Sequence, residues 1–200
     1  MGAPATLPDV YLSADEFLAR YDGVNAEWVD GQVLLMTPAT PRHQLITNLL
    51  VSLFQHYCDE REAGLVLSGP AAMKLGKAVR EPDVMIVARE HEDRISARCL
   101  EGPADLVVEV ISPESRVRDR GEKFYEYEAG GVREYWLIDP VRCQTEQYRR
   151  SEKGLFEMVP AGDPPRLRSE VFPGIWIDPT WLWEERLPKL NVVLREWGLV

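Results

Sequence analysis

The sequence predicts an α/β fold, in which a mixed β-sheet is flanked by helices and extended by one hairpin at each end. Residues 43–58 (HQLITNLLVSLFQHYC) repeat apolar side chains at the spacing of one helix face. Three short apolar runs, at 82–88, 105–112 and 134–139, have the length and the valine and isoleucine content of buried strands. A second helix is expected over 118–131, where a glycine pair closes it.

The length and composition of the chain suit one soluble domain. Its 200 residues are 45% hydrophobic, so we expect a single domain over 1–200 with its core at about 43–140. No uncharged apolar stretch approaches the roughly 18 residues of a membrane span. The start, MGAPATLPDVYLSADEF, lacks a basic segment followed by an apolar one. We therefore expect a cytoplasmic protein that does not interact with a membrane.

Cysteine and histidine residues are too scattered for a structural metal site. They form neither a CxxC pair nor an HExxH motif, so we expect buried free thiols and no disulfide framework. The net charge of −10 argues against broad, sequence-independent affinity for nucleic acid, because such affinity depends on neutralising phosphates. A local basic patch remains compatible with this charge.

The N-terminal part predicts a short helix followed by a hairpin. LSADEFLARY (12–21) begins with a capping box made by Ser13 and Glu16. AEWVDGQVLLMT (26–37) contains two strand-like runs around an Asp-Gly pair, which is a strong hairpin signal.

Shorter strands complete the sheet. We expect two of them at about 65–68 and 71–75, and a C-terminal hairpin from 143–150 and 154–159. The charged interval 89–103 is expected to be a mobile or weakly helical loop.

Glu109 stands alone inside the apolar run of a predicted buried strand. Strand periodicity places it with Val107 and Ile111 on one face. An ionised carboxylate there is costly unless a cation or donated hydrogen bonds compensate it. Asp83 begins the preceding strand, directly after Pro82, and if the two strands are neighbours the two carboxylates lie close enough to share a divalent cation. Alternatively, Asp83 simply starts its strand and Glu109 pairs with an arginine.

Lys123 is the third candidate. Asp119 is a plausible N-cap with Glu122 three residues later, so Lys123 is expected in the first turn of the helix, on the side of Arg116 and Arg120. A lysine there, just after the strand that carries Glu109, could reach a bound phosphate. Its alternative role is that of an ordinary solvated helix residue.

These residues carry a family resemblance. The pair PD (82–83) followed by E-x-hydrophobic (109–111) resembles the motif of the PD-(D/E)XK nuclease superfamily, with Ile111 where that motif normally has lysine. The longer string VREPDVMIV…DLVVEVISPESRVRDRGEKFYEYEAGGVREYWLIDP is similar to the Uma-two type restriction endonuclease family, in which the lysine is displaced to the following helix, where Lys123 stands. The resemblance covers nearly the whole chain.

The resemblance implies a restriction-endonuclease-like fold and metal-dependent hydrolysis of phosphodiester bonds, with DNA as the expected nucleic acid. Asp83 and Glu109 would bind Mg²⁺ or Mn²⁺, and Lys123 would steady the attacking water or the developing charge. The implied catalytic residues are thus Asp83, Glu109 and Lys123. A homodimer is expected, with the tryptophans at 176, 181 and 183 as a candidate seam.

Several readings stay open. The net negative charge, and Ile111 in place of the usual motif lysine, favour a second hypothesis. In it the chain is a catalytically inactive nucleic-acid- or protein-binding module of the same fold. Glu27 could be a further carboxylate of the site, although a surface strand residue is the favoured interpretation. His43 could contact the metal ligands or act as a base, and the favoured interpretation is a solvated residue at a helix start. Aromatic residues at 125, 127, 135 and 136 are expected to be core.

Overall fold

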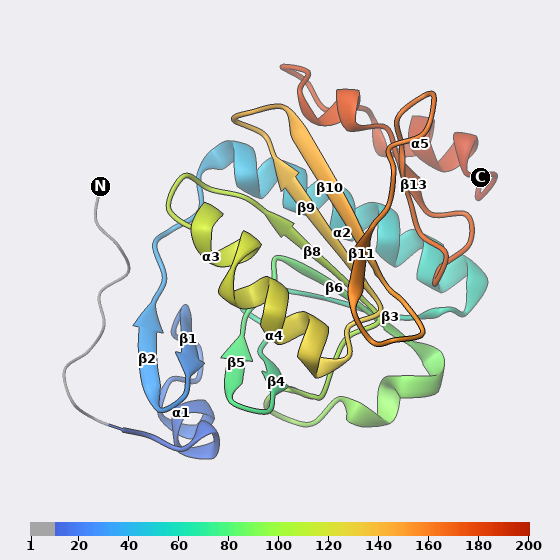
Figure 1. Ribbon diagram of the computed structural model, residues 1–200. Coiled ribbons are helices and arrows are strands. Elements are labelled where there is room, and N and C mark those ends of the chain that lie inside the picture. Colours follow the sequence, from blue (N-terminus) through green and yellow to red (C-terminus); the bar gives the residue numbers. More distant parts are fainter. Residues whose placement is uncertain (1–10) are drawn as a thin grey trace.

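The structure, a computed structural model that describes residues 11–200, is a layered α/β fold (Figure 1). The helices and 3₁₀ segments of the described part are α1 (Ala14–Arg20), α2 (Pro41–Arg61), η1 (Arg89–Arg94), α3 (Arg116–Arg120), α4 (Glu122–Gly130), η2 (Pro179–Leu182) and α5 (Leu190–Glu196). None of them is both long and apolar enough to cross a membrane. The expectation about a secretory signal rests partly on residues 1–10, which lie outside the described residues.

Two sheets and a short ribbon contain the strands of the described residues. The larger sheet has the order β11 (Phe156–Met158), β10 (Gln144–Arg150), β9 (Glu134–Asp139), β8 (Leu106–Val110), β6 (Val84–Ala88) and β3 (Gly64–Ser68). The smaller sheet has the order β2 (Gln32–Leu35), β1 (Ala26–Val29), β5 (Ala78–Arg80), β4 (Met73–Leu75) and β7 (Leu100–Glu101). The ribbon pairs β12 (Leu167–Arg168) with β13 (Trp176–Ile177).

The larger sheet is mixed, which confirms the predicted fold class. Strands β8 and β9 run parallel, whereas β6 pairs antiparallel with β8 and β10 pairs antiparallel with β9. Both predicted hairpins are present, β1 with β2 and β10 with β11. In the first, the turn residues Asp30 and Gly31 have φ of 44° and 95°, as a two-residue hairpin turn requires.

The strands divide into two sheets rather than one, which corrects the expectation of a single mixed sheet. Strand β4 does not continue the larger sheet but pairs with β5 and β7, two short strands that the sequence does not signal. The reason is tertiary, because β5 also pairs with β1 of the N-terminal hairpin. The smaller sheet is thereby built from segments that are far apart in the chain. The charged interval 89–103 contains the 3₁₀ helix η1, in agreement with the weakly helical alternative, and the short strand β7, which was not expected.

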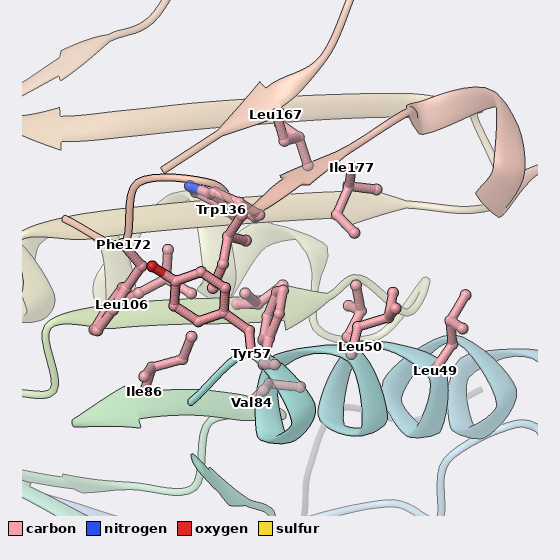
Figure 2. Close-up of a cluster of buried hydrophobic side chains, with 14 of the residues drawn as sticks. Leu49, Leu50, Tyr57, Val84, Ile86, Leu106, Trp136, Leu167, Phe172 and Ile177 are labelled. Carbon is pink, nitrogen blue, oxygen red and sulfur yellow. The ribbon is translucent and has the colours of Figure 1, made fainter. Parts of the chain in front are cut away.

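Side chains of the larger sheet alternate between two cores. On one face, Leu106, Val108 and Val110 pack with α2, α5 and the C-terminal ribbon. Figure 2 shows this core, with Leu50 of α2 directed toward the strands. On the other face, Val107 and residues of β4 and α4 form a second core. The alternation predicted for the strand that carries Glu109 is therefore confirmed.

The helix predicted over 118–131 is in fact two helices, α3 and α4, separated at Gly121. A Cβ at Gly121 would lie 2.7 Å from the carbonyl oxygen of Val117, so the chain can pass this point only with glycine. Asp119 is consequently not the N-cap of the second helix but a buried residue in the last turn of α3. Lys123 does lie in the first turn of α4, as predicted.

Candidate active site

A polar cleft of about 130 Å³ lies where β8 ends and β6 begins, between the first turns of α2 and α4. All three predicted catalytic residues line it, because the antiparallel pairing of β6 with β8 brings their ends together. The described residues that line it also include, in addition to Asp83, Glu109 and Lys123, the charged or titratable side chains of Glu27, His43, Glu81, Glu114 and Arg118. Carboxylates thus outnumber the two side chains of fixed positive charge.

Asp83 is held by one of its two carboxylate oxygens. The backbone N–H of Val110 donates to its Oδ2 at 2.7 Å, and His43 Nε2 lies 3.1 Å from the same oxygen. His43 is therefore a direct partner of Asp83, and the interpretation as a solvated residue is wrong. Burial lowers the pKa of His43, but the bond to Asp83 and its charge outweigh this and raise the pKa. Within residues 11–200, no donor bonds Asp83 Oδ1.

Glu109 is buried, and one of its oxygens is also fixed. Its Oε1 accepts hydrogen bonds from Lys123 Nζ at 2.8 Å and from the Tyr127 hydroxyl at 2.7 Å. In the described part of the chain, Oε2 has no donor. Burial, together with the nearby carboxylates of Asp119 and Asp83, raises the pKa of Glu109 to about 8 against the opposing effect of Lys123.

Lys123 reaches the strand from the neighbouring helix. Its ammonium group lies 2.8 Å from Glu109 Oε1, 2.9 Å from Glu27 Oε1 and 3.7 Å from Asp119 Oδ1. Burial disfavours its charge, but these carboxylates outweigh burial, so its pKa is raised and it stays protonated. Ile111 is buried in the second core and does not line the cleft.

Glu27 is a buried member of the site, and the interpretation as a surface strand residue is wrong. It is 1% exposed, and its Oε2 accepts a hydrogen bond from Arg80 at 2.8 Å. Burial alone would raise its pKa, but Lys123, Arg80 and Arg118 together hold it at about 2. The short strand run that contains Glu27 does not indicate this burial, because the side chains that contact the carboxylate, Arg80, Arg118 and Lys123, come from distant segments.

Arg80 binds Glu27 on the side away from the cleft and links it to Glu126. It is fully buried. Its guanidinium donates two hydrogen bonds, of 2.7 and 2.8 Å, to Glu126 of α4 and a third to Glu27. This fork ties the smaller sheet to α4. The residue was not predicted, since a single arginine between strands carries no sequence signal of its own.

Three further charged residues around the cleft, Glu81, Arg118 and Asp119, are absent from the predicted site, and Asp119 was expected only as an N-cap. Glu81 lines the cleft, and its Oε2 is buried without a hydrogen-bond partner, as is Asp119 Oδ1. Arg118 Nε lies 3.7 Å from Glu27 Oε2. Glu81 directly precedes the PD pair, so its position was the one available hint.

Arg116 and Arg120 do not share the expected helix face with Lys123 but lie near Asp139. Both guanidinium groups lie near the buried Asp139, at 3.4 and 3.7 Å, and not beside Lys123. The reason is the break between α3 and α4, which removes the common helical face. The aromatic side chains at 127, 135 and 136 are buried core, as expected, whereas Tyr125 is exposed.

Replacing Glu81 by glutamine should stabilise the protein at alkaline pH. Burial and the charge of Glu27 raise the pKa of Glu81 from its ordinary 4.5 to about 8. Its contribution to stability is therefore fully present below pH 4.5 and is lost as the pH rises through 8. At each pH we compare the free energy of unfolding of Glu81→Gln with that of wild type. We expect this difference to be about 1–2 kcal/mol more in favour of the variant at pH 9 than at pH 5.

Urea denaturation at both pH values measures this gain. Glu152→Gln, at an exposed position, is the matched control. Its free energy of unfolding should differ from that of wild type by the same amount at both pH values. A Glu81→Gln difference that does not change with pH would contradict the prediction.

The cleft fits a divalent cation. Mg²⁺ and Mn²⁺ prefer carboxylate oxygens together with water, and Asp83 Oδ1 and Glu109 Oε2 have no hydrogen-bond donor among the described residues. Glu81 Oε2 and Asp119 Oδ1 are also buried without a hydrogen-bond partner. Over residues 11–200, no three His, Cys, Asp or Glu side chains converge as a ready metal cage. The fit therefore rests on two carboxylates and open space for water.

Comparisons with known proteins agree on the family and the fold. The model of the Uma2 family, described as "Putative restriction endonuclease", matches residues 14–180. Two proteins of Synechocystis sp. (strain ATCC 27184 / PCC 6803 / Kazusa) are similar in sequence. "Uncharacterized protein slr1290" is 28% identical over 156 residues, which are 76% of this chain and 77% of that protein. "Uncharacterized protein sll1609" is 27% identical over 146 residues, 70% of this chain and 81% of that protein.

A solved structure shares the fold. It is the crystal structure of "a putative nuclease belonging to DUF820" from Anabaena variabilis ATCC 29413, which superposes with a TM-score of 0.72 at 17% sequence identity. The match covers 86% of this chain and 97% of that chain.

Proposed function

The chain belongs to the Uma2 family of restriction-endonuclease-like proteins, and on that premise we propose that it is a metal-dependent nuclease that hydrolyses phosphodiester bonds in DNA. One observation carries the proposal. Asp83 and Glu109 line the same cleft, each with one oxygen fixed by donors and the other without a donor among the described residues, beside a charged lysine. Both the metal requirement and the DNA substrate are part of the proposal.

Asp83 and Glu109 would hold Mg²⁺ or Mn²⁺, which when bound would neutralise charge on the phosphoryl oxygens. The chain itself orients both ligands. Val110 N–H and His43 fix Asp83 Oδ2, and the Tyr127 hydroxyl fixes Glu109 Oε1. Such fixed ligands need little rearrangement when the substrate arrives.

Lys123 is suited to electrostatic stabilisation and not to proton abstraction. Its raised pKa keeps the ammonium group charged at neutral pH, so it has no free electron pair with which to accept a proton. Positive charge placed beside the phosphate would stabilise the negative charge that develops on its oxygens. Lys123 also lies within hydrogen-bond distance of Glu109, which places that charge next to the proposed metal ligand.

Nicking of supercoiled plasmid at low salt tests this function. We expect the wild-type protein to convert supercoiled to open-circular DNA with Mg²⁺ or Mn²⁺, and EDTA to stop the reaction, because the two carboxylates need the cation to approach a phosphate. DNA binding that weakens steeply with salt, with no product over hours, would contradict the proposal. It would favour the inactive binding module instead.

A further inference from the structure

A second cleft, of about 420 Å³, lies on the face of the larger sheet opposite Glu109. It is bounded by the second half of β10, the loop after β11 and the ribbon β12–β13 (Figure 1). Gln147, which lines it, pairs with Trp136, and Trp136 belongs to the core on the α2 side. Glu109 pairs with Leu137, which belongs to the core on the α4 side. Whatever binds in this cleft is therefore separate from the chemistry proposed above.

The cleft concentrates arginine in an acidic chain. It is lined by Arg149, Arg166 and Arg168, although the net charge of the protein is −10. Arg149 pairs with Glu170 at 2.6 Å. Among the described residues, Arg166 and Arg168 have no carboxylate partner within salt-bridge distance, and Arg166 Nε is buried without a hydrogen-bond acceptor. Two guanidinium groups are thus left uncompensated at one place.

The ribbon fixes the side chain of Arg166 and the backbone of Arg168, whose side chain is exposed. Arg168 lies opposite Trp176 in the register of β12 and β13, and the guanidinium of Arg166 stacks 3.8 Å from the centre of the Trp176 ring. The side chain of Gln147 donates to the carbonyl oxygen of Arg168 at 2.6 Å and accepts from its N–H at 3.1 Å. Leu167, between the arginines, is buried in the core, so the ribbon is anchored to the sheet (Figure 2).

We propose that this arginine cleft binds the phosphate group of a small phosphorylated ligand about the size of a mononucleotide. Two planar guanidinium groups with free donors match phosphate oxygens, and arginine recognises phosphate through paired hydrogen bonds. The volume falls within the range of about 300–1,000 Å³ that is common for small-molecule sites. Prolines at 160, 164 and 173 give the cleft an apolar wall for the rest of the ligand. Because Arg166 already covers the Trp176 ring, the phosphate and not base stacking provides the recognition.

Isothermal titration of the full chain, without divalent metal, tests the proposal with inorganic phosphate, AMP and adenosine. We expect AMP to bind, phosphate to bind more weakly and adenosine to bind at least about tenfold more weakly than AMP, because the guanidinium groups recognise the phosphate. Arg166→Gln/Arg168→Gln should weaken AMP binding about tenfold or more. The matched control, Arg61→Gln/Arg195→Gln, removes the same charge at exposed positions on α2 and α5 and should leave the affinity within about twofold.

Three results would overturn the proposal: no binding of any phosphate compound, equal binding of AMP and adenosine, or equal losses in both double variants. Binding of a short single-stranded oligonucleotide but not of AMP, lost only in Arg166→Gln/Arg168→Gln, would also overturn it, in favour of a nucleic-acid contact. Arg168→Gln alone, at an exposed position, serves if the double variant does not fold. Since the assay contains no metal and no cleavable substrate, its outcome is independent of the nuclease test.

Discussion

Glu109→Gln is expected to abolish plasmid nicking while leaving the protein folded. Glutamine keeps the size of the side chain and can still accept from Lys123 and Tyr127, but it removes the negative charge that a divalent cation needs. Loss of one group that stabilises charge in the transition state usually lowers the rate by about 10²–10³-fold, and loss of a metal ligand should lower it at least as much. Initial nicking rates of wild type and variant, with Mn²⁺ in excess, measure the effect.

Metal binding gives a readout of the same residue that does not depend on turnover. Because the pKa of Glu109 is about 8, the carboxyl must lose a proton before it can hold Mn²⁺, so the wild-type affinity for Mn²⁺ should rise about tenfold per pH unit between pH 6 and pH 8. The variant should bind Mn²⁺ weakly and with a flatter dependence on pH. Glu114→Gln, another acid of the cleft, is the control. Undiminished nicking by Glu109→Gln would remove Glu109 from the proposed site.

Arg80→Met should cause the largest loss of stability of any single substitution considered. Arg80 is fully buried between Glu27 and Glu126. Methionine fills its volume but leaves Glu126 without its two-bond partner and Glu27 without one of its three cations. Breaking a buried ion pair from one side typically costs about 3–5 kcal/mol in the free energy of unfolding. Urea denaturation at pH 7 measures this loss.

Two control variants distinguish the loss of a buried ion pair from the loss of a positive charge alone. Arg89 makes an exposed ion pair with Glu62 at 2.8 Å, and Arg89→Met should cost less than about 1 kcal/mol because water solvates both partners. Arg80→Lys keeps the charge without the planar fork and should fall between the two. A loss below about 1 kcal/mol for Arg80→Met would mean that Lys123 and Arg118 alone compensate Glu27.

The local elements of this protein could be predicted because their signals are short-range. The apolar spacing of α2, the capping box of α1 and the Asp-Gly hairpin turn each depend on residues within a few positions of one another. The strands β6 and β8 are predictable for the same reason, as runs of buried residues. Local patterning fails at Gly121, where a close backbone contact ends one helix and starts another.

Part of the candidate site was predictable as well. Asp83 and Glu109 stand at the beginning and near the end of two adjacent strand signals, and an antiparallel pair brings those positions together. Lys123 follows at the start of the next helix and reaches Glu109. Whether these three residues act in catalysis stays a prediction until the variants are assayed.

The α/β class, the two-faced strand around Glu109 and the family of the chain could all be inferred from the order of the residues alone. Tertiary packing is what places Glu27 and Glu81 in the same cleft, brings Arg80 against Glu27, and leaves Arg166 and Arg168 lining a second cleft on the opposite face. The physical reason is that burial and charge compensation are properties of groups from distant segments. The carboxylate of Glu27 in β1 is a buried partner of Lys123 because β5, α3 and α4 each bring a cation to it, and no local pattern predicts those contacts.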